Sequence, residues 1–272
     1  MLAYCVSVEK ITNILQNNAS RIYVMSCMIN RYHSVIMTDY DLSYTKNKEC
    51  KTVSMTFEEM KQNKEVRELI QKGDENLGIL GYTDHSTAHC VLVAEQAARI
   101  LDKLGYSKHE IELVKIAGLM HDMGNAINRT RHAEYGAILA YDILKQTDLS
   151  LSDCVTIASA IGNHDESTGG ATDPISAALI IADKTDVRRN RVREKPKANF
   201  DIHDRVNYAV TESRLKINPE KKVIALNLQL DTKICTMYEY FDIFLGRMMM
   251  CRGAAELLGV TFKLTANGDK VL

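Results

Sequence analysis

The spacing of apolar residues along the chain changes once, near residue 200. Before that point, from residue 56 onward, apolar side chains recur three or four positions apart, which is the period of an amphipathic helix. Two segments also begin with helix-start chemistry, Thr56 before an acidic turn and Asp173 before Pro174. The pattern predicts helices over residues 56–71, 85–104, 108–123, 132–145, 152–164 and 174–189.

After residue 200 the apolar period becomes two. The segment "VIALNLQL", residues 223–230, alternates apolar and polar side chains and predicts a half-buried strand. We expect residues 205–217 to pair with it through the turn "NPEK", and a helix over about 232–258 to precede a last strand at 260–264. The predicted fold class is therefore mainly α, a helical bundle with a small C-terminal α+β (β-β-α-β) module. The expected domains are 55–199 and 200–272.

Residues 1–54 show no persistent helical or strand period. Met55 stands directly before the predicted helix start at Thr56. We expect residues 1–54 to be an N-terminal extension of unknown role, or Met55 to be the native start of the chain.

Composition and charge narrow the function classes. Of the 272 residues, 46% are hydrophobic and 25% charged, which is typical of a folded protein, and the net charge is −1. No global field would attract duplex nucleic acid or an anionic membrane, so an anionic substrate must be bound by local charges. The seven cysteines form no C-x-x-C pair, and no apolar run resembles a signal peptide or a membrane span. A cytoplasmic location is expected.

Candidate chemistry is concentrated in the helical region, which holds six of the eight histidines. Most lie on apolar stripes, where each one alone is more often a hydrogen-bonded core residue than a ligand. Asp122 and Asp183 each end an apolar run, and a buried carboxylate needs a cation. Asp183 has an ordinary alternative, an ion pair with Lys184 or the arginines that follow. Imidazoles combined with carboxylates favour Fe, Mn, Co or Zn over Mg or Ca.

The order of these residues resembles a known signature. His89, then His121-Asp122, then Asp183 resembles the H…HD…D pattern of the HD-domain metal-dependent phosphohydrolases, over about residues 81–193. The segments "HAEYGAILA" and "AIGNHDESTGG" resemble extra ligand segments of the two-metal branches, the HD-GYP group and the bacterial dinucleoside polyphosphate hydrolases. HD-GYP proteins have a lysine where Asn125 stands, and their Gly-Tyr-Pro segment is absent.

The resemblance implies two divalent ions. One would be held by His89, His121, Asp122 and Asp183. The second would be held by His132 and His164 with Asp122 bridging, and either Asp165 or Asn163 would add a ligand.

The same resemblance implies hydrolysis of a phosphate ester or anhydride in a small phosphorylated substrate of nucleotide or dinucleotide type, by a hydroxide bridging the metals. Asp122 would be the central catalytic residue. His85 is a candidate for protonating the leaving oxygen, or else a helix-start histidine bonded to Asp84. Lys184 is a candidate for stabilising negative charge. Arg189 and Arg188 are candidates for binding substrate phosphates, against the alternative of a solvated charge run.

Two alternatives to this function remain open at this point. The protein could be a non-catalytic metal and nucleotide sensor, or a one-metal nucleotidase in which His132 and His164 only bind substrate. A homodimer through the C-terminal module is also expected, because a small sheet packed on a single helix leaves a face to cover.

Overall fold

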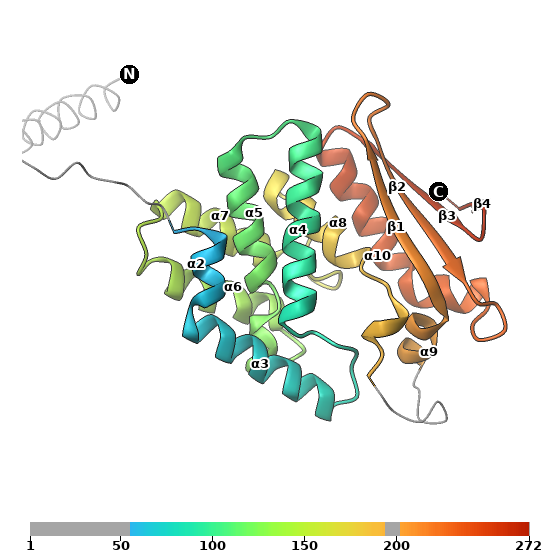
Figure 1. Cartoon of the computed structure of the whole chain (residues 1–272), viewed down its shortest axis with the longest axis horizontal. Helices are drawn as coiled ribbons and strands as arrows, with labels where there is room; N and C mark the ends of the chain where they lie inside the picture. Colours follow the sequence, from blue (N-terminus) through green and yellow to red (C-terminus); the bar gives the residue numbers. More distant parts are fainter. Residues whose placement is uncertain (1–54, 194–201, 272) are drawn as a thin grey trace, which may run out of the picture. The chain divides into compact units, whose positions relative to one another are not determined.

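The structure, a computed structural model, describes residues 55–193 and 202–271 (Figure 1). The expected N-terminal extension and the expected start at Met55 concern residues that lie largely outside the described ranges. The described residues group into one compact unit, which is mainly helical and carries one small sheet. The predicted fold class is confirmed.

The helical part consists of short helices wrapped around a central one. Their bounds are α2 Phe57–Gln62, α3 Lys64–Ile79, α4 Thr87–Leu104, α5 Lys108–Met120, α6 His132–Leu144, α7 Leu151–Gly162 and α8 Pro174–Lys184, with the 3-10 turns η2 Met123–Ala126 and η3 Arg189–Arg191. Helix α8 packs against α4, α5, α7 and α10, and nearly all its side chains are buried. A helix that is apolar on every side must lie in the core, which explains the run "ISAALIIA".

Helix starts follow the predicted capping chemistry. The Thr56 hydroxyl accepts a hydrogen bond from the Glu59 amide, and the Glu59 side chain accepts one from the Thr56 amide. Asp173 caps α8 in the same way, with Pro174 in the first turn. Such caps satisfy backbone groups that a helix end leaves unpaired, and they fix where α2 and α8 begin.

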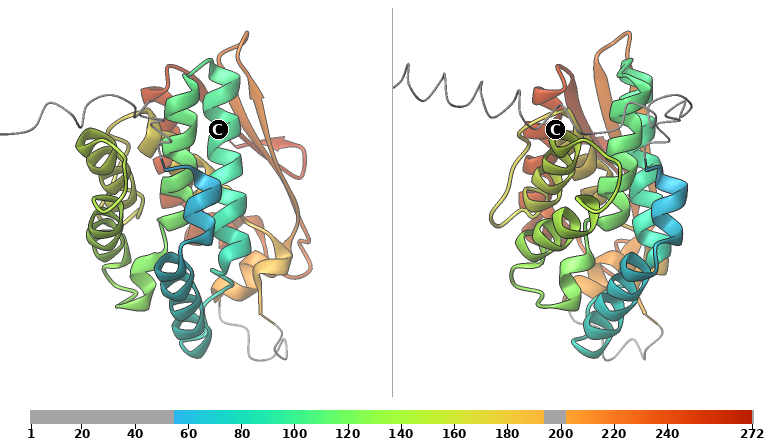
Figure 2. Two further views of the ribbon diagram at one scale, coloured as in Figure 1. Left: turned by 60° about the vertical axis from the view of Figure 1, so that its left-hand side comes forward. Right: turned by 90° about the vertical axis from the view of Figure 1, so that its left-hand side faces the viewer.

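The C-terminal part forms the predicted module, with one short strand more. Its elements are α9 Ile202–Ala209, β1 Val210–Asn218, β2 Val223–Leu230, α10 Met237–Leu257, β3 Thr261–Ala266 and β4 Asp269–Lys270. The strand order is β1-β2-β3-β4, with β2 and β3 parallel and the other pairs antiparallel. Helix α10 makes the crossover between the parallel strands and packs against both β3 and α8 (Figure 2).

Two predicted boundaries in this module were wrong. The strand expected over residues 205–217 begins only at Val210, because residues 202–209 form α9, which buries Val206 and Ala209 one turn apart. The helix expected from residue 232 begins at Met237, because Thr236 forms a capping box with Glu239. Both segments have apolar spacings that suit more than one element, so local capping and packing decide the boundary.

Among residues 55–193 and 202–271, no helix combines the length and the apolar content that crossing a lipid bilayer requires.

Candidate metal centre

Histidine and aspartate side chains from five helices converge in the interior. His89 lies in α4, and His121 and Asp122 follow the last residue of α5. The others come from the start of α6, the segment after α7 and the end of α8, and they are His132, His164 and Asp183. The four imidazole rings form a chain whose neighbouring centroids lie 4.9–5.3 Å apart. All six residues that the sequence predicts as metal ligands are therefore brought together.

Four ligand atoms form a first group. Asp122 Oδ2 lies 3.0 Å from His121 Nε2 and 3.6 Å from His89 Nε2. Asp183 Oδ1 lies 3.4 Å from His89 Nε2 and 3.7 Å from His121 Nε2. Ligands that each sit about 2.0–2.2 Å from one transition-metal ion lie roughly 3–3.5 Å from each other. The spacing of this group fits a single cation at its centre.

Unsatisfied atoms in the same group support that fit. Among the described residues, His89 Nε2, His121 Nε2 and Asp122 Oδ2 are buried without a hydrogen-bond partner. Leaving a buried polar atom unpaired costs about 1–3 kcal/mol, and more when the atom is charged. Three such atoms facing one another therefore indicate a missing positive partner, and a divalent metal ion matches this donor set.

A second group lies on the other side of Asp122. His132 Nε2 is 3.2 Å from His164 Nε2, 3.7 Å from Asp122 Oδ1 and 3.6 Å from Asp165 Oδ2. Asp122 thus presents Oδ2 to the first group and Oδ1 to the second. The amide of Asn163 donates to the Ser159 carbonyl, so Asp165 is the better placed of the two additional ligand candidates.

Three of the imidazoles are oriented by their own local backbone. His121 Nδ1 lies 2.8 Å from the Gly118 carbonyl, His164 Nδ1 lies 2.6 Å from the Ile161 carbonyl and His132 Nδ1 lies 3.1 Å from the Arg129 carbonyl. Each carbonyl belongs to the residue three positions earlier. A carbonyl can only accept, so Nδ1 carries the proton and Nε2 offers its lone pair to the cluster.

His89 is oriented differently, by a carboxylate that the sequence analysis missed. Its Nδ1 lies 2.8 Å from Asp186 Oδ2, and Asp186 is buried. The Arg188 guanidinium donates to both carboxylate oxygens of Asp186, and Arg191 donates to the Asp186 carbonyl. The available signal was a second acid three residues after Asp183, in "ADKTD".

Gly124 allows the chain to turn beside the cluster. A methyl group at this position would lie 1.9 Å from the His132 carbonyl oxygen and 2.5 Å from the Gly136 nitrogen. The start of α6 therefore packs directly on Gly124, and this contact places His132 next to Asp122. The adjacent pair His121-Asp122 stands where α5 has ended, so both side chains can reach a cation beyond the helix.

The electrostatics of the cluster favour a cation. Burial lowers the pKa of His121, but the carboxylates of Asp122 and Asp183 outweigh it and raise that pKa to about 10. Burial raises the pKa of Asp122, yet the imidazoles of His121 and His85 hold it well below its ordinary value. Burial and the neighbouring His121 and His132 lower the pKa of His164 to about 3. The negative field that attracts a proton to His121 is the field that a metal ion would neutralise.

Lys184 contacts the rim of the cluster. Its buried Nζ lies 2.8 Å from Asp183 Oδ2, so the other oxygen of Asp183 is left for the imidazoles. The same Nζ lies 2.8 Å from Glu166 Oε2, and Arg247 of α10 lies 2.8 Å from Glu166 Oε1. Glu166 and Arg247 were not predicted from the sequence. Through Lys184 they connect α10 of the C-terminal module to Asp183 of the cluster.

His85 lies beside the cluster, with its ring centroid 5.6 Å from that of His89. Its Nδ1 is 2.7 Å from the Thr83 carbonyl, whereas Asp84 accepts a hydrogen bond from Ser86. The structure therefore contradicts the alternative in which His85 bonds to Asp84. Burial lowers the pKa of His85 well below its usual value.

The two arginines predicted to bind substrate are not among the ligand atoms. Arg188 pairs with the Asp186 carboxylate, and that carboxylate in turn contacts His89. Arg189 donates to the Tyr208 carbonyl at 2.6 Å and stacks on the Tyr208 ring. Their roles as phosphate ligands stay predictions.

Comparison with known proteins agrees with this geometry. Residues 87–198 match the HD domain. The matched span of the HD domain contains all six clustered residues. An uncharacterised protein, MJ1020, of Methanocaldococcus jannaschii is 26% identical over 62% of this chain and 74% of its own length.

A solved structure, a predicted HD superfamily hydrolase from an uncultured Thermotogales bacterium, is 21% identical to this chain. It covers 49% of this chain and 75% of its own, with a TM-score of 0.37. The finer likeness to the HD-GYP group and to the dinucleoside polyphosphate hydrolases stays a prediction.

Proposed function

We propose that this protein is a metal-dependent phosphohydrolase that cleaves an ester or anhydride bond in a small phosphorylated substrate of nucleotide or dinucleotide type. The observation that carries the proposal is the carboxylate of Asp122, whose two oxygens face two separate groups of ligand atoms. The match of residues 87–198 to the HD domain supports it. When bound, two divalent ions would lower the pKa of water and neutralise charge on the phosphoryl oxygens.

The chain's own residues have distinct tasks in this proposal. The carbonyl-bonded histidines keep their Nε2 lone pairs directed at the cluster, and they need no rearrangement to do so. Lys184 holds Asp183 by one oxygen and keeps a positive charge beside the site. His85 is the candidate for protonating the leaving oxygen: its Nδ1–H is held by the Thr83 carbonyl, so Nε2 would carry the transferred proton, and the ring has that proton only in its cationic form.

Turnover measurements test the proposal. Purified protein loaded with Mn²⁺ would be assayed on nucleoside phosphates, cyclic nucleotides and dinucleoside polyphosphates, with Asp122→Ala alongside. The proposal expects hydrolysis by the wild-type protein and its loss in the variant. Asp153→Asn is the matched control, because this carboxylate also contacts an imidazole, that of His109, but is not among the clustered ligands, and the His109 side chain is 59% exposed. Metal-replete protein that hydrolyses none of these compounds would favour the sensor alternative.

Metal stoichiometry separates the two enzymatic alternatives. Two ions per chain support the proposal, whereas one ion would return His132 and His164 to the role of substrate ligands. The expected homodimer through the C-terminal module is a separate proposal, and a monomer in gel filtration would contradict it.

A further inference from the structure

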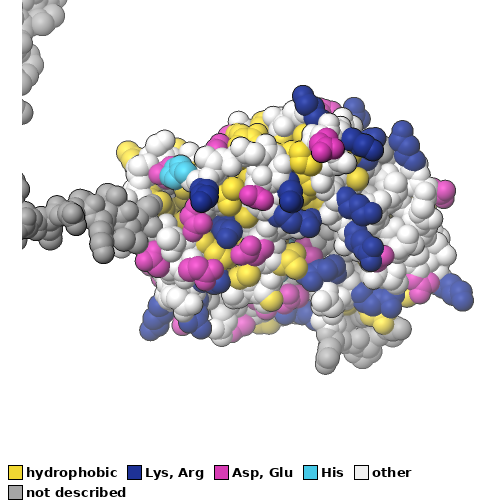
Figure 3. Space-filling view, turned by 45° about the horizontal axis from the view of Figure 1, so that its top comes forward, with side chains coloured by type: hydrophobic (Ala, Val, Ile, Leu, Met, Phe, Trp, Pro, Cys, Tyr) yellow, Lys and Arg dark blue, Asp and Glu magenta, His cyan; other side chains and the backbone are white. Residues whose placement is uncertain are grey.

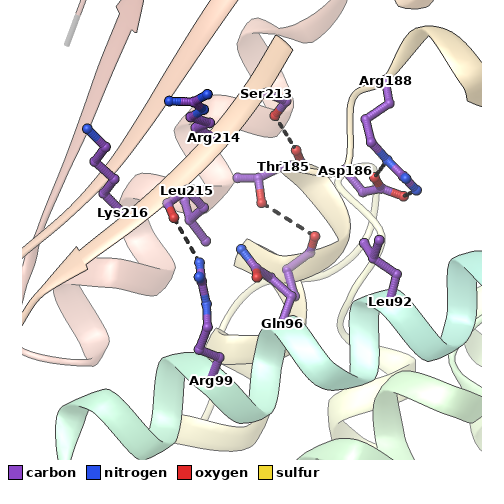
Figure 4. Close-up of a pocket in the computed structure, with 11 residues that line it drawn as sticks. Leu92, Gln96, Arg99, Thr185, Asp186, Arg188, Ser213, Arg214, Leu215 and Lys216 are labelled. Atoms are coloured by element: carbon purple, nitrogen blue, oxygen red, sulfur yellow. Dashed lines mark hydrogen bonds and ion pairs between the residues drawn. The ribbon is translucent and has the colours of Figure 1, made fainter.

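A cavity of about 400 Å³ lies behind the metal centre, on the other side of Asp186. Helix α4 forms one wall, the segment after α8 forms the floor and strand β1 forms the opposite wall (Figure 4). The volume falls within the range of small-molecule sites. None of the six clustered metal-ligand candidates is among the residues that line it.

Most of the charged lining residues are cationic: Arg99 of α4, Arg188 of the segment after α8, and Arg214 and Lys216 of β1. The guanidinium groups of Arg99 and Arg188 lie on the side of β1 that faces α4, whereas the side chains of Arg214 and Lys216 extend on the other side of the strand (Figure 4). Asp186 is the one acidic residue among the described lining residues, and its carboxylate is already occupied by Arg188 and His89. Figure 3 shows Lys and Arg side chains gathered along the sheet side of the molecule. With two guanidinium groups and one carboxylate on the α4 side of β1, the cavity carries a net positive charge and is suited to an anion.

The two guanidinium groups come from separate elements, Arg99 from α4 and Arg188 from the segment after α8, which favours a ligand with more than one charged group. Arg99 donates to the Leu215 carbonyl across the cavity, so its guanidinium spans from α4 to β1. The Ser213 hydroxyl donates to the Thr185 carbonyl at the floor.

Asp186 connects this cavity to the metal centre. Its side chain is 1% exposed, whereas that of Arg188 is 34% exposed, so Arg188 is the partner that an incoming anion can reach. An anion that draws Arg188 away would leave Asp186 with one fewer cationic donor. Asp186 would then accept the His89 Nδ1 proton more strongly, and His89 Nε2 would become a better metal ligand.

We propose that this cavity binds a small anion carrying at least two phosphate groups, and that occupancy strengthens metal binding through Arg188, Asp186 and His89. The anion site stands independently of catalysis, while the coupling rests on the metal centre of the proposed function. Coupling between two sites is reciprocal and typically amounts to about 5–150-fold in affinity.

Calorimetric titration of metal-free protein with pyrophosphate tests the site. The expected result is one binding event per chain that weakens at least about tenfold in Arg99→Gln, because a charge-assisted contact contributes about 1.5–3 kcal/mol. Lys184→Gln should retain this binding, because Lys184 lies at the metal centre. Arg252→Gln, an exposed arginine of α10 paired with Glu256, is the control and should also retain it. Absence of binding, or loss in Lys184→Gln with retention in Arg99→Gln, would overturn the proposal.

Metal titration tests the coupling without any chelating anion in solution. Arg188→Gln removes the guanidinium from Asp186 and imitates its withdrawal by a ligand. The variant should bind Mn²⁺ about fivefold more tightly or better, by the same coupling range. Unchanged or weaker Mn²⁺ binding would overturn the coupling. Failure of phosphohydrolase activity would leave both of these binding results unaffected, so the two proposals are separable.

Discussion

The histidines of the cluster fall into two kinds according to what orients them. His121, His132 and His164 each donate from Nδ1 to a backbone carbonyl three residues earlier. His89 donates instead to the carboxylate of Asp186, 97 residues away in the sequence. The first kind is fixed as soon as its helix end forms, whereas the second depends on α4 and α8 being packed together.

The first kind of histidine is held rigidly, whereas the strength of the second kind as a metal ligand can be adjusted. A backbone carbonyl has a fixed dipole, so the three locally oriented imidazoles can be disturbed only by moving a helix end. The strength of the Asp186 carboxylate as an acceptor depends on Arg188, which donates to it, and on Arg191, which lies 3.8 Å from it, and each side chain can be changed on its own. The centre thus has a rigid side and a side whose ligand strength can be altered from a distance.

The largest effect should follow from a change to the backbone on the rigid side. In Gly124→Ala the added methyl would meet the His132 carbonyl at 1.9 Å, so α6 must shift and His132 with it. We expect a loss of about 1–3 kcal/mol in the free energy of unfolding, and loss of the second ion. Urea denaturation and metal analysis measure both.

Gly246→Ala is the matched control for that change. This glycine lies in α10, and a methyl group there meets nothing within 4 Å. Alanine should stabilise the helix by up to about 1 kcal/mol. A Gly124→Ala protein that is as stable as the wild type and still binds two ions would refute the packing argument.

The next largest effect should come from Asp186→Asn on the adjustable side. The amide is neutral and is a weaker acceptor for His89 Nδ1, so metal affinity should fall about 10–100-fold. The helical content measured by circular dichroism should be retained, because no backbone contact is lost. Mn²⁺ affinity equal to that of the wild type would show that His89 needs no carboxylate partner.

A smaller effect is expected at the rim. In Glu166→Gln, Lys184 loses one of its two carboxylates and is drawn more fully to Asp183, where it competes with the cation. Mn²⁺ affinity should decrease by less than about tenfold, below the effect at Asp186. Equilibrium titration gives the ranking, and a greater loss at Glu166 than at Asp186 would reverse it.

The smallest effect should come from Asp153→Asn. Its partner His109 has a 59% exposed side chain, so the 2.8 Å contact is largely solvated. Exposed pairs contribute about 0–1 kcal/mol, and the free energy of unfolding should change by no more than this. A loss of Mn²⁺ affinity in Asp153→Asn comparable to that in Asp186→Asn would mean that any carboxylate–imidazole pair has this effect, whether or not it lies beside the metal centre.

The sequence predicts the rigid side well, because its signals are local. The apolar stripe before it places His121, the resemblance to known ligand segments adds His132 and His164, and the apolar runs before Asp122 and Asp183 mark helix ends. The structure brings these residues together. The strands at 223–230 and 260–264 and the helix between them were also predicted from the change of period after residue 200, whereas the parallel pairing of these strands is a finding of the structure.

The adjustable side could not be predicted in the same way. Asp186 becomes a partner of His89 only after α8 packs against α4, and no periodicity encodes a contact across 97 residues. Glu166 joins Lys184 to Arg247 across separate segments, and appeared in the sequence only as a loop acid. Residues 205–209 were predicted as the start of a strand, but they belong to α9, which buries Val206 and Ala209 on one helical face.

The central claim is that Asp122 divides two ion sites. Anomalous diffraction from crystals grown with Mn²⁺ tests it directly. The account predicts two peaks about 3.5–4 Å apart, one among His89, His121 and Asp183 and one beside His132 and His164, with Asp122 between them. A single peak, or none among these residues in metal-replete crystals, would contradict it.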